Sequence, residues 1–190
     1  RHCPQCMLVF VPPADYLDRE AEEACYRLHE NALDDPGYRA FLSRLAAPVL
    51  SQLPEGARGL DFGCGPEPAL AAMLSEAGHE VALYDSFFYR EPDALNRRYD
   101  FITASEVVEH LHEPGPVLEQ LWSALRPGGL LGIMTKLLRS REAFAQWHYI
   151  RDPTHVCFFS RQAWQWWGKA RGVTPSFFGQ DVILFRKPGA

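Results

Sequence analysis

The feature that most constrains the fold is a glycine-rich turn between two apolar segments in residues 58–85. The first segment ends around Asp61, and Gly63 and Gly65 follow it before a helix-like stretch. Glycine permits a sharp turn and a close backbone approach, so the free N–H groups at the start of the helix can meet a polar ligand. The second segment ends in Asp85, twenty residues after Gly65. A carboxylate at this spacing is placed to bind a ribose diol.

The chain after residue 57 alternates between strand-like and helix-like segments, which is typical of a parallel sheet covered by helices. The predicted strands lie at 58–62, 80–84, 100–104 and 129–135. The predicted helices lie at 68–77, 114–125 and 160–170. A further strand is expected within 86–98, where no segment has a clear strand pattern. Two strand-like runs at 173–178 and 182–187 flank a turn and predict an antiparallel C-terminal strand. We therefore expect an α/β fold with a mostly parallel sheet and helices on both faces.

The first fifty residues do not follow this alternation. They combine a Cys-x-x-Cys turn with two helix-like stretches, at 18–28 and 38–50. The second stretch has Phe41, Leu42 and Leu45 on one apolar stripe. We expect residues 1–50 to form a Cys-x-x-Cys segment and a helical cap on a main domain over residues 51–190.

Four segments together resemble the class I methyltransferases that use S-adenosylmethionine (SAM). Asp61-x-Gly63-x-Gly65 resembles the family's first motif, and Asp85 resembles its ribose-binding acid. Residues 99–104 resemble the family's fourth strand, and the Pro-Gly-Gly turn in 125–131 resembles the start of its fifth. The resemblance covers about residues 57–190 and implies a Rossmann-like fold.

This resemblance implies an enzyme that transfers a methyl group from SAM to an acceptor. The residues that it implies for SAM binding are Asp61, Gly63, Gly65, Asp85, Ser105 and Glu106. Such an enzyme holds acceptor, methyl carbon and sulfur in line and excludes water, and it needs a base only where the acceptor is protonated.

One position departs from the family's first motif, because Glu67 stands where a third glycine is usual. A carboxylate there crowds SAM or repels its carboxylate, which leaves an alternative: a non-catalytic binding module with an impaired cofactor site. A dehydrogenase is disfavoured, because its glycine pattern needs glycine where Pro68 stands and no substrate domain follows.

Glu106, Glu109 and His110 follow the fourth predicted strand at spacings that place all three on one face of a helix. Two carboxylates and an imidazole so placed can hold a divalent cation. The arrangement resembles the metal site of small-RNA 2′-O-methyltransferases and of some quinone O-methyltransferases. In the alternative interpretation, the first acid lies by SAM and the histidine only caps or pairs.

Residues 147–155 follow the fifth strand and should overhang the acceptor site, since ligands of open parallel sheets lie outside the carboxyl ends of the strands. His148 or His155 can take a proton from an acceptor, with Asp152 orienting the ring. The segment resembles an Asp-Pro-x-His segment of a methyltransferase subfamily. A structural role for these histidines in a tight proline turn is the alternative.

Five cysteines are scattered along the chain, and this odd number does not indicate a disulfide framework. Cys3 and Cys6 have the spacing of half a zinc site, whereas structural zinc takes four ligands. Cysteines upstream of Arg1 would complete it, and several sugar and small-molecule methyltransferases resemble this in having an N-terminal zinc ribbon. Within the chain, Cys25 or His29 are the alternatives, and without them we expect no metal at the pair.

The formal net charge of −5, with no run of Lys or Arg, disfavours a nucleic-acid partner, because the field of the molecule repels a phosphate backbone. No apolar stretch approaches the roughly 20 residues that span a bilayer, and the first residues do not resemble a secretory signal. We therefore expect a cytoplasmic protein with no membrane partner and a small-molecule methyl acceptor.

Overall fold

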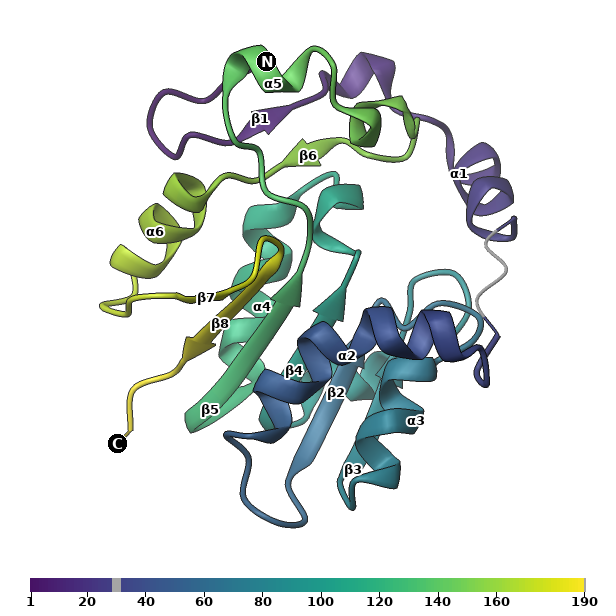
Figure 1. Ribbon diagram of the computed structural model, residues 1–190, viewed down its shortest axis with the longest axis vertical. Coiled ribbons are helices and arrows are strands. Elements are labelled where there is room, and N and C mark those ends of the chain that lie inside the picture. The colour runs from purple at the N-terminus through teal and green to yellow at the C-terminus, as the bar shows by residue number, and fades with distance from the viewer. Residues whose placement is uncertain (29–31, 190) are drawn as a thin grey trace.

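The computed structural model describes residues 1–28 and 32–189 of the chain. A central sheet within this part has six strands in the order β3-β2-β4-β5-β8-β7 (Figure 1). Their bounds are β2 Arg58–Phe62, β3 Glu80–Tyr84, β4 Tyr99–Ser105, β5 Leu125–Met134, β7 Ser176–Phe178 and β8 Val182–Arg186. The first four of these run parallel to one another, whereas β8 is antiparallel to both β5 and β7. The predicted α/β fold is confirmed, including its antiparallel C-terminal strand.

Helices cover both faces of this sheet. One face carries α2 (Pro36–Leu50) and α3 (Ala69–Glu76), and the other carries α4 (Pro114–Ala124) and α6 (Arg161–Lys169). Successive strand residues point to opposite faces, which is why the apolar runs of the strands are buried on both sides. The core under α4 and α6 contains Leu60, Ile102, Leu131 and Ile183, and the core under α2 and α3 contains Phe101, Leu130 and Leu184.

The segment between β3 and β4 has no strand of the sheet. Residues Asp85 and Tyr89 form an isolated antiparallel bridge, and a 3₁₀ helix, η2, covers Pro92–Asn96. The expected strand within 86–98 is therefore wrong. Proline favours the first turn of a helix, and it removes a donor that a strand would need. Strand β3 is consequently an edge of the sheet.

Asp35 caps the start of helix α2, because its side chain accepts from the backbone N–H groups of Gly37 and Tyr38. Its Leu45 and Val49 are fully buried in the core between the helix and the sheet. The apolar stripe of α2 packs into the core on one face of the sheet. A domain boundary after residue 50 stays a prediction.

The N-terminal segment lies over the carboxyl ends of the parallel strands (Figure 1). Strand β1 (Val9–Phe10) pairs with β6 (Cys157–Phe158) in a separate two-stranded sheet. The 3₁₀ helix η1 (Pro13–Asp15) and helix α1 (Arg19–Tyr26) follow β1, and the short helices α5 (Arg141–Phe144) and η4 (His148–Arg151) precede β6. Residues far apart in the chain thus meet above one edge of the sheet. Among the described residues, no helix has the length and apolar character needed to cross a membrane.

Candidate active site

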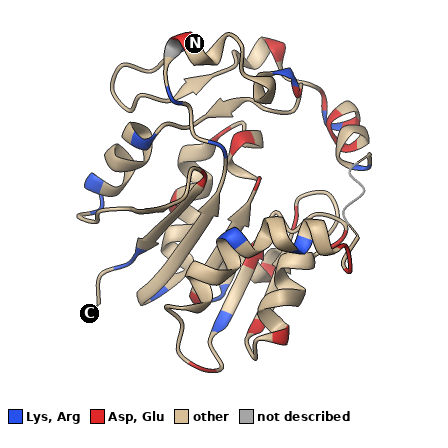
Figure 2. Cartoon of the chain, in the orientation of Figure 1, with Lys and Arg blue, Asp and Glu red and all other residues tan. Residues whose placement is uncertain are grey.

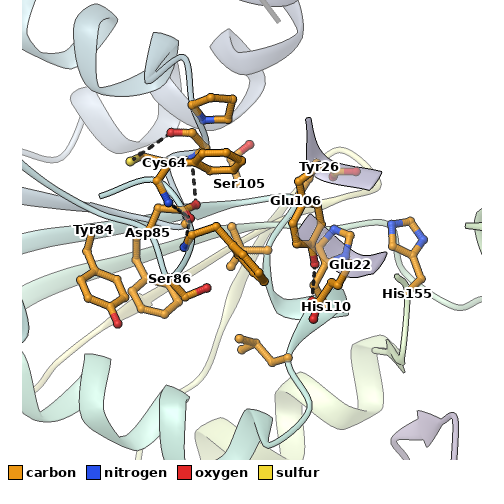
Figure 3. A pocket seen from close by; sticks show the side chains of 18 of the residues that line it. Glu22, Tyr26, Cys64, Tyr84, Asp85, Ser86, Ser105, Glu106, His110 and His155 are labelled. Atoms are coloured by element: carbon orange, nitrogen blue, oxygen red, sulfur yellow. Dashed lines mark hydrogen bonds between the residues drawn. The ribbon is translucent and has the colours of Figure 1, made fainter. Parts of the chain in front are cut away.

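A cavity of about 790 Å³ opens at the carboxyl ends of β2, β3 and β4. Its walls come from the turn after β2, the turn after β3, the residues after β4, helix α1 and the segment 147–155. Figure 3 shows Cys64 and Asp85 on one side of this cavity and Glu106, His110 and His155 on the other. The position agrees with the rule that ligands of open α/β sheets lie outside the carboxyl ends of the strands.

The glycine turn and Asp85 are in direct contact. Gly63 and Gly65 have backbone φ angles of 69° and 66°, which residues other than glycine rarely adopt. The N–H of Gly65 donates to Asp85 Oδ2 at 3.0 Å, and Asp85 Oδ1 accepts from the N–H groups of Phe87 and Phe88 at 2.8 and 3.1 Å. Asp85 therefore holds the two turns of the cavity together.

The same turn leaves room for a ligand on one side only. A Cβ on Gly63 would lie 2.5 Å from Val107 Cγ2, whereas a Cβ on Gly65 would meet no atom within 4 Å. The space beside Gly65 is thus open, and the backbone there can approach a bound molecule. This geometry fits the residues that the sequence predicted for SAM. Glu67 lies exposed at the rim of the cavity, outside this turn.

Asp61 lies beneath the turn and is almost fully buried. Thr103 Oγ1 on the neighbouring strand donates to Asp61 Oδ1 at 2.8 Å. Burial raises the pKa of Asp61 to about 7, although the bond from Thr103 acts in the opposite direction. At neutral pH this carboxyl is therefore close to its point of half-protonation.

We expect Asp61→Asn to change how stability depends on pH. A carboxyl whose pKa rises from 3.8 to about 7 on folding favours the folded state below about pH 4, and this contribution is lost as pH rises through 7. The unfolding free energy of the wild type, minus that of Asp61→Asn, should therefore fall between pH 4 and 7 and then level off. Urea unfolding of the ligand-free proteins measures this difference. Parallel curves for the two proteins would contradict the burial effect at Asp61.

The segment after β4 does not form an α-helix, the arrangement that would place Glu106, Glu109 and His110 on one face. Ser105 ends β4 at the cavity, Glu106 has a φ of 52°, and residues Val108–His110 form the 3₁₀ helix η3. A left-handed residue interrupts an α-helix, so Glu106, Glu109 and His110 do not share a helical face. The N–H of Glu106 instead donates to Met134 O at 2.8 Å on the next strand.

A tyrosine brings the two glutamates together. Burial raises the pKa of the Tyr149 hydroxyl, which therefore stays protonated and acts as a donor. It donates to Glu109 Oε1 and lies 3.3 Å from Glu106 Oε2. Burial raises the pKa of Glu106 to about 8 and that of Glu109 to about 7, and for Glu106 the neighbouring Glu109 adds to the effect. Sequence reasoning did not single out Tyr149; its place beside His148 was the available signal.

The histidines of the cavity differ in their surroundings. His148 is exposed, and its Nε2 accepts from Lys136 Nζ at 2.9 Å. His155 is half-buried, and its Nδ1 donates to Tyr149 O at 2.6 Å. Burial, with the nearby His110, lowers the pKa of His155 to about 4, so its ring is neutral at pH 7.

Asp152 shapes the turn before His155. Its Oδ1 accepts from the N–H and the hydroxyl of Thr154 at 2.9 and 2.6 Å, and its Oδ2 lies 3.8 Å from His155 Nε2. Burial opposes ionisation of Asp152, yet the bonds from Thr154 hold its pKa below the ordinary value. His148, Asp152 and His155, the residues predicted to be catalytic, thus line the same cavity.

The structure groups the predicted metal ligands differently from the sequence. Among the described residues, Glu109, His110 and His155 form a cluster whose ligand atoms lie within 4.8 Å of one another, and Glu106 is outside it. No such cluster among these residues includes Cys3 or Cys6, which lie half-buried before β1. Cys25 lies on α1 and is also outside the cluster, and His29 falls outside the described residues. A zinc site at the cysteine pair stays a prediction.

Comparison with known proteins finds a matching family model and curated relatives of this chain. A family model described as a methyltransferase domain matches residues 31–175. A ubiquinone biosynthesis O-methyltransferase of Bradyrhizobium sp. is 33% identical over 47% of this chain and 44% of its own length. A tRNA 5-carboxymethoxyuridine methyltransferase of Escherichia coli O157:H7 is 29% identical over 64% of this chain and 65% of its own length. The chain therefore spans about half to two thirds of these curated relatives.

Solved structures share the fold. A 1,6-didemethyltoxoflavin-N1-methyltransferase of Burkholderia thailandensis, solved with S-adenosylhomocysteine, has a TM-score of 0.63 at 18% identity and covers 95% of both chains. A magnesium protoporphyrin IX methyltransferase of Synechocystis, also solved with S-adenosylhomocysteine, has a TM-score of 0.62 at 12% identity, over 88% of this chain and 94% of its own.

Proposed function

Because this chain belongs to the methyltransferase domain family, we propose that it transfers a methyl group from SAM to a hydroxyl group of a small-molecule acceptor. The observation that carries this proposal is the glycine turn at Gly63 and Gly65 with Asp85 bonded to it, at one end of a cavity whose other end holds acid–base groups. Similarity to a ubiquinone biosynthesis O-methyltransferase supports oxygen as the accepting atom.

The residues around the turn fit SAM. The open space beside Gly65 accommodates a ligand at the backbone, and Asp85 is the acid that would hold ribose hydroxyls. Ser105 at the end of β4 and Glu106 directly after it line the same cavity, and Asp61 is buried beneath the glycine turn. The alternative of a binding module with a site impaired by Glu67 is not favoured, because this side chain is exposed at the rim.

The charge of the cavity favours an acceptor without phosphate groups. Lys136 is the one Lys or Arg among its described lining residues, whereas four lining residues are carboxylates: Glu22, Glu67, Asp85 and Asp152. A fifth acid, Glu106, is mostly protonated at pH 7 because its pKa is about 8. Acidic residues also lie along α1 at its edge (Figure 2). Such a wall repels a phosphate backbone. Similarity to a tRNA methyltransferase makes a nucleic acid the competing acceptor.

We place the acceptor between the segment 147–155 and the carboxyl end of β4, where the predicted catalytic residues His148, Asp152 and His155 lie. When bound, SAM supplies a methyl carbon made electrophilic by its positive sulfur, so that the acceptor oxygen gains the methyl group and loses its proton. His155 is better placed than His148 to assist this loss, because the Nε2 lone pair of His148 already accepts from Lys136. Asp152 positions His155 through the turn at Thr154.

Ligand binding to Asp85→Ala tests the cofactor placement. S-adenosylhomocysteine should raise the melting temperature of the wild type, since a ligand that binds only the folded state stabilises it. Asp85→Ala should weaken this binding by about 1–3 kcal/mol, or roughly 5- to 150-fold, because the hydrogen bonds of a buried carboxylate are lost. Calorimetric titration measures the affinity, and Asp93→Ala, an exposed aspartate of η2 outside the cavity lining, is the matched control. Unchanged affinity in Asp85→Ala would remove this placement.

Transfer of a labelled methyl group from SAM then distinguishes the two classes of acceptor, a small molecule and a nucleic acid. With a cell extract as the source of acceptors, we expect label in the small-molecule fraction and none above background in RNA. Label confined to RNA would replace the proposed acceptor and leave the cofactor site standing.

A further inference from the structure

Lys136 is the one Lys or Arg among the described residues that line the cavity, and we propose that it binds a carboxylate group of the methyl acceptor. The acceptor is then a small hydroxy acid, whose hydroxyl takes the methyl group while the ammonium group of Lys136 holds its carboxylate. This inference rests on the proposed function and deepens it, because it names the class of the small-molecule acceptor.

Lys136 directly follows β5, on the acceptor side of the cavity. The backbone just before it is fixed, because Thr135 N donates to Asp181 O at 2.9 Å. The glycine turn follows β2, and β4 lies between β2 and β5 in the sheet. The ammonium group is therefore separated from the region assigned to SAM by the width of one strand, and it lies beside the space assigned to the acceptor.

The positive charge of Lys136 has no anionic partner in the described part of the chain, because none of the ion pairs there includes it. Its Nζ donates to His148 Nε2 at 2.9 Å and lies 5.2 Å from the centre of the Tyr149 ring. An imidazole that accepts from an ammonium group is neutral, and an aromatic ring attracts a cation without cancelling its charge. Both contacts thus orient the side chain and leave its charge uncompensated.

The acids around this lysine have other partners. Glu106 Oε2 lies 3.3 Å from the hydroxyl of Tyr149, which is a donor to it. Asp181, whose carbonyl fixes the residue before Lys136, has its carboxylate paired with Arg44 at 2.5 Å. These contacts leave the lysine as the positive group that a ligand meets in the cavity.

A carboxylate on the ligand suits this lysine. The side chain is half-buried, and a charge partly removed from water is costly without a partner of opposite sign. An ammonium group has three donors, of which His148 takes one. The other two can form charge-assisted hydrogen bonds with a carboxylate, which are stronger than bonds between neutral groups.

Tyr149 places the lysine within reach of the predicted base. Lys136 Nζ lies 5.2 Å and the centre of the His155 ring 4.0 Å from the centre of the Tyr149 ring, and all three residues line the cavity. One small molecule can therefore contact both groups, with its carboxylate at Lys136 and its hydroxyl at His155.

The balance of charge favours a carboxylate over a phosphate at this position. A phosphate monoester has a charge of about −1.5 to −2 at neutral pH, whereas one ammonium group neutralises a single negative charge. The carboxylates of the lining, Glu22, Glu67, Asp85 and Asp152, would repel the remainder. A group with one negative charge avoids that repulsion.

The products labelled by SAM in a cell extract test the proposal with the intact chain. Methylation of a hydroxyl leaves the carboxylate free, so the labelled small molecules should be retained by an anion exchanger at about pH 7. They should be released at about pH 2.5, where a carboxyl group with a pKa near 4 is protonated. A phosphate ester keeps a negative charge at the lower pH and would stay bound.

Variants of the lysine connect this product to the site. Lys136→Met removes the charge and should lower labelling of the acidic products about 10- to 100-fold, because hydrogen bonds to charged groups are among the stronger contacts of a ligand. Lys136→Arg keeps the charge and should lose much less. Lys169→Met, which alters an exposed lysine of α6 outside the cavity lining, is the matched control and should label as the wild type does.

Once the product is identified, the acceptor and its carboxamide form a matched pair of substrates. The wild type should methylate the acid faster than the amide, whereas Lys136→Met should methylate the two at similar rates. A structural role of the lysine would slow both substrates alike and leave this preference unchanged. Affinity for S-adenosylhomocysteine, measured on every variant, should stay the same and shows that each variant is folded; if Lys136→Met does not fold, Lys136→Gln takes its place.

The possible outcomes distinguish this inference from the proposed function. Label confined to neutral products, or an unchanged preference for the acid in Lys136→Met, would overturn the carboxylate site while methyl transfer to a small molecule stands. Label retained by the exchanger at both pH values would replace the carboxylate by a phosphate. No label in any small molecule with the wild type would overturn the proposed function and this inference with it.

Discussion

Replacing His155 by Gln is expected to lower turnover about one hundred-fold, the lower end of what a positioned base contributes, because a pKa of about 4 makes this imidazole a weak base at neutral pH. His155 presents its Nε2 to the cavity wall while its Nδ1 is held by Tyr149 O. Gln keeps the size and polarity of the side chain but has no basic nitrogen. The loss should therefore appear in kcat, while the affinity for S-adenosylhomocysteine stays the same. Single-turnover kinetics with an identified acceptor measure it.

Two further variants interpret this result. His112→Gln alters an exposed histidine that stacks on Tyr16 outside the cavity lining, and it should keep wild-type turnover. His148→Gln tests the other predicted base. If His148→Gln loses turnover and His155→Gln does not, the proton passes to His148 and its bond with Lys136 breaks during the reaction. If neither variant slows turnover, the segment 147–155 is a structural lid and catalysis rests on positioning alone.

The part of the site that sequence reasoning predicted is the part that topology dictates. Gly63, Gly65 and Asp85 follow two neighbouring parallel strands, whose carboxyl ends meet at one edge of the sheet. Strand β2 pairs with β3 in register from Arg58 to Phe62, so the two turns had to meet. The bond from Gly65 N to Asp85 is the result. Periodicity and chain order are sufficient for such contacts.

Contacts that depend on backbone irregularity were not predictable in this way. The spacing of Glu106, Glu109 and His110 suits a helix, yet the left-handed φ of Glu106 prevents one. Periodicity does not report such an angle in a residue other than glycine. The strand expected within 86–98 is absent for a related reason. Asp85 and Tyr89 close a turn there, and Pro92 begins the 3₁₀ helix η2.

The cluster of Glu109, His110 and His155 depends on a contact between distant segments. Val156 N donates to Glu109 O at 2.8 Å, and this bond places His155 beside His110. Strand β6 follows directly and pairs with β1, so the N-terminal segment helps to fix the same wall. No local pattern in either segment indicates the other, which is why the sequence paired His110 with Glu106 rather than with His155.

Gly63→Ala should destabilise the ligand-free protein more than Gly65→Ala does. Both residues have positive φ, where an alanine costs roughly 1–2 kcal/mol. Only at Gly63 does the added Cβ also meet Val107, at 2.5 Å, and such overpacking costs about 1–3 kcal/mol more. Urea unfolding should therefore show losses of about 2–5 kcal/mol for Gly63→Ala and about 1–2 kcal/mol for Gly65→Ala.

Val107→Ala isolates the steric part of this difference. In a double-mutant cycle, Gly63→Ala combined with Val107→Ala should lose less stability than the sum of the single changes. Val107→Ala removes the Cγ2 atom that the new Cβ at position 63 would meet at 2.5 Å. Gly65→Ala should show the opposite balance: a modest loss of stability but a clear loss of S-adenosylhomocysteine affinity, since its Cβ enters the space that the ligand needs. Equal losses of stability in the two alanine variants, or full ligand affinity in Gly65→Ala, would contradict the division of this turn into a packed side and a ligand side.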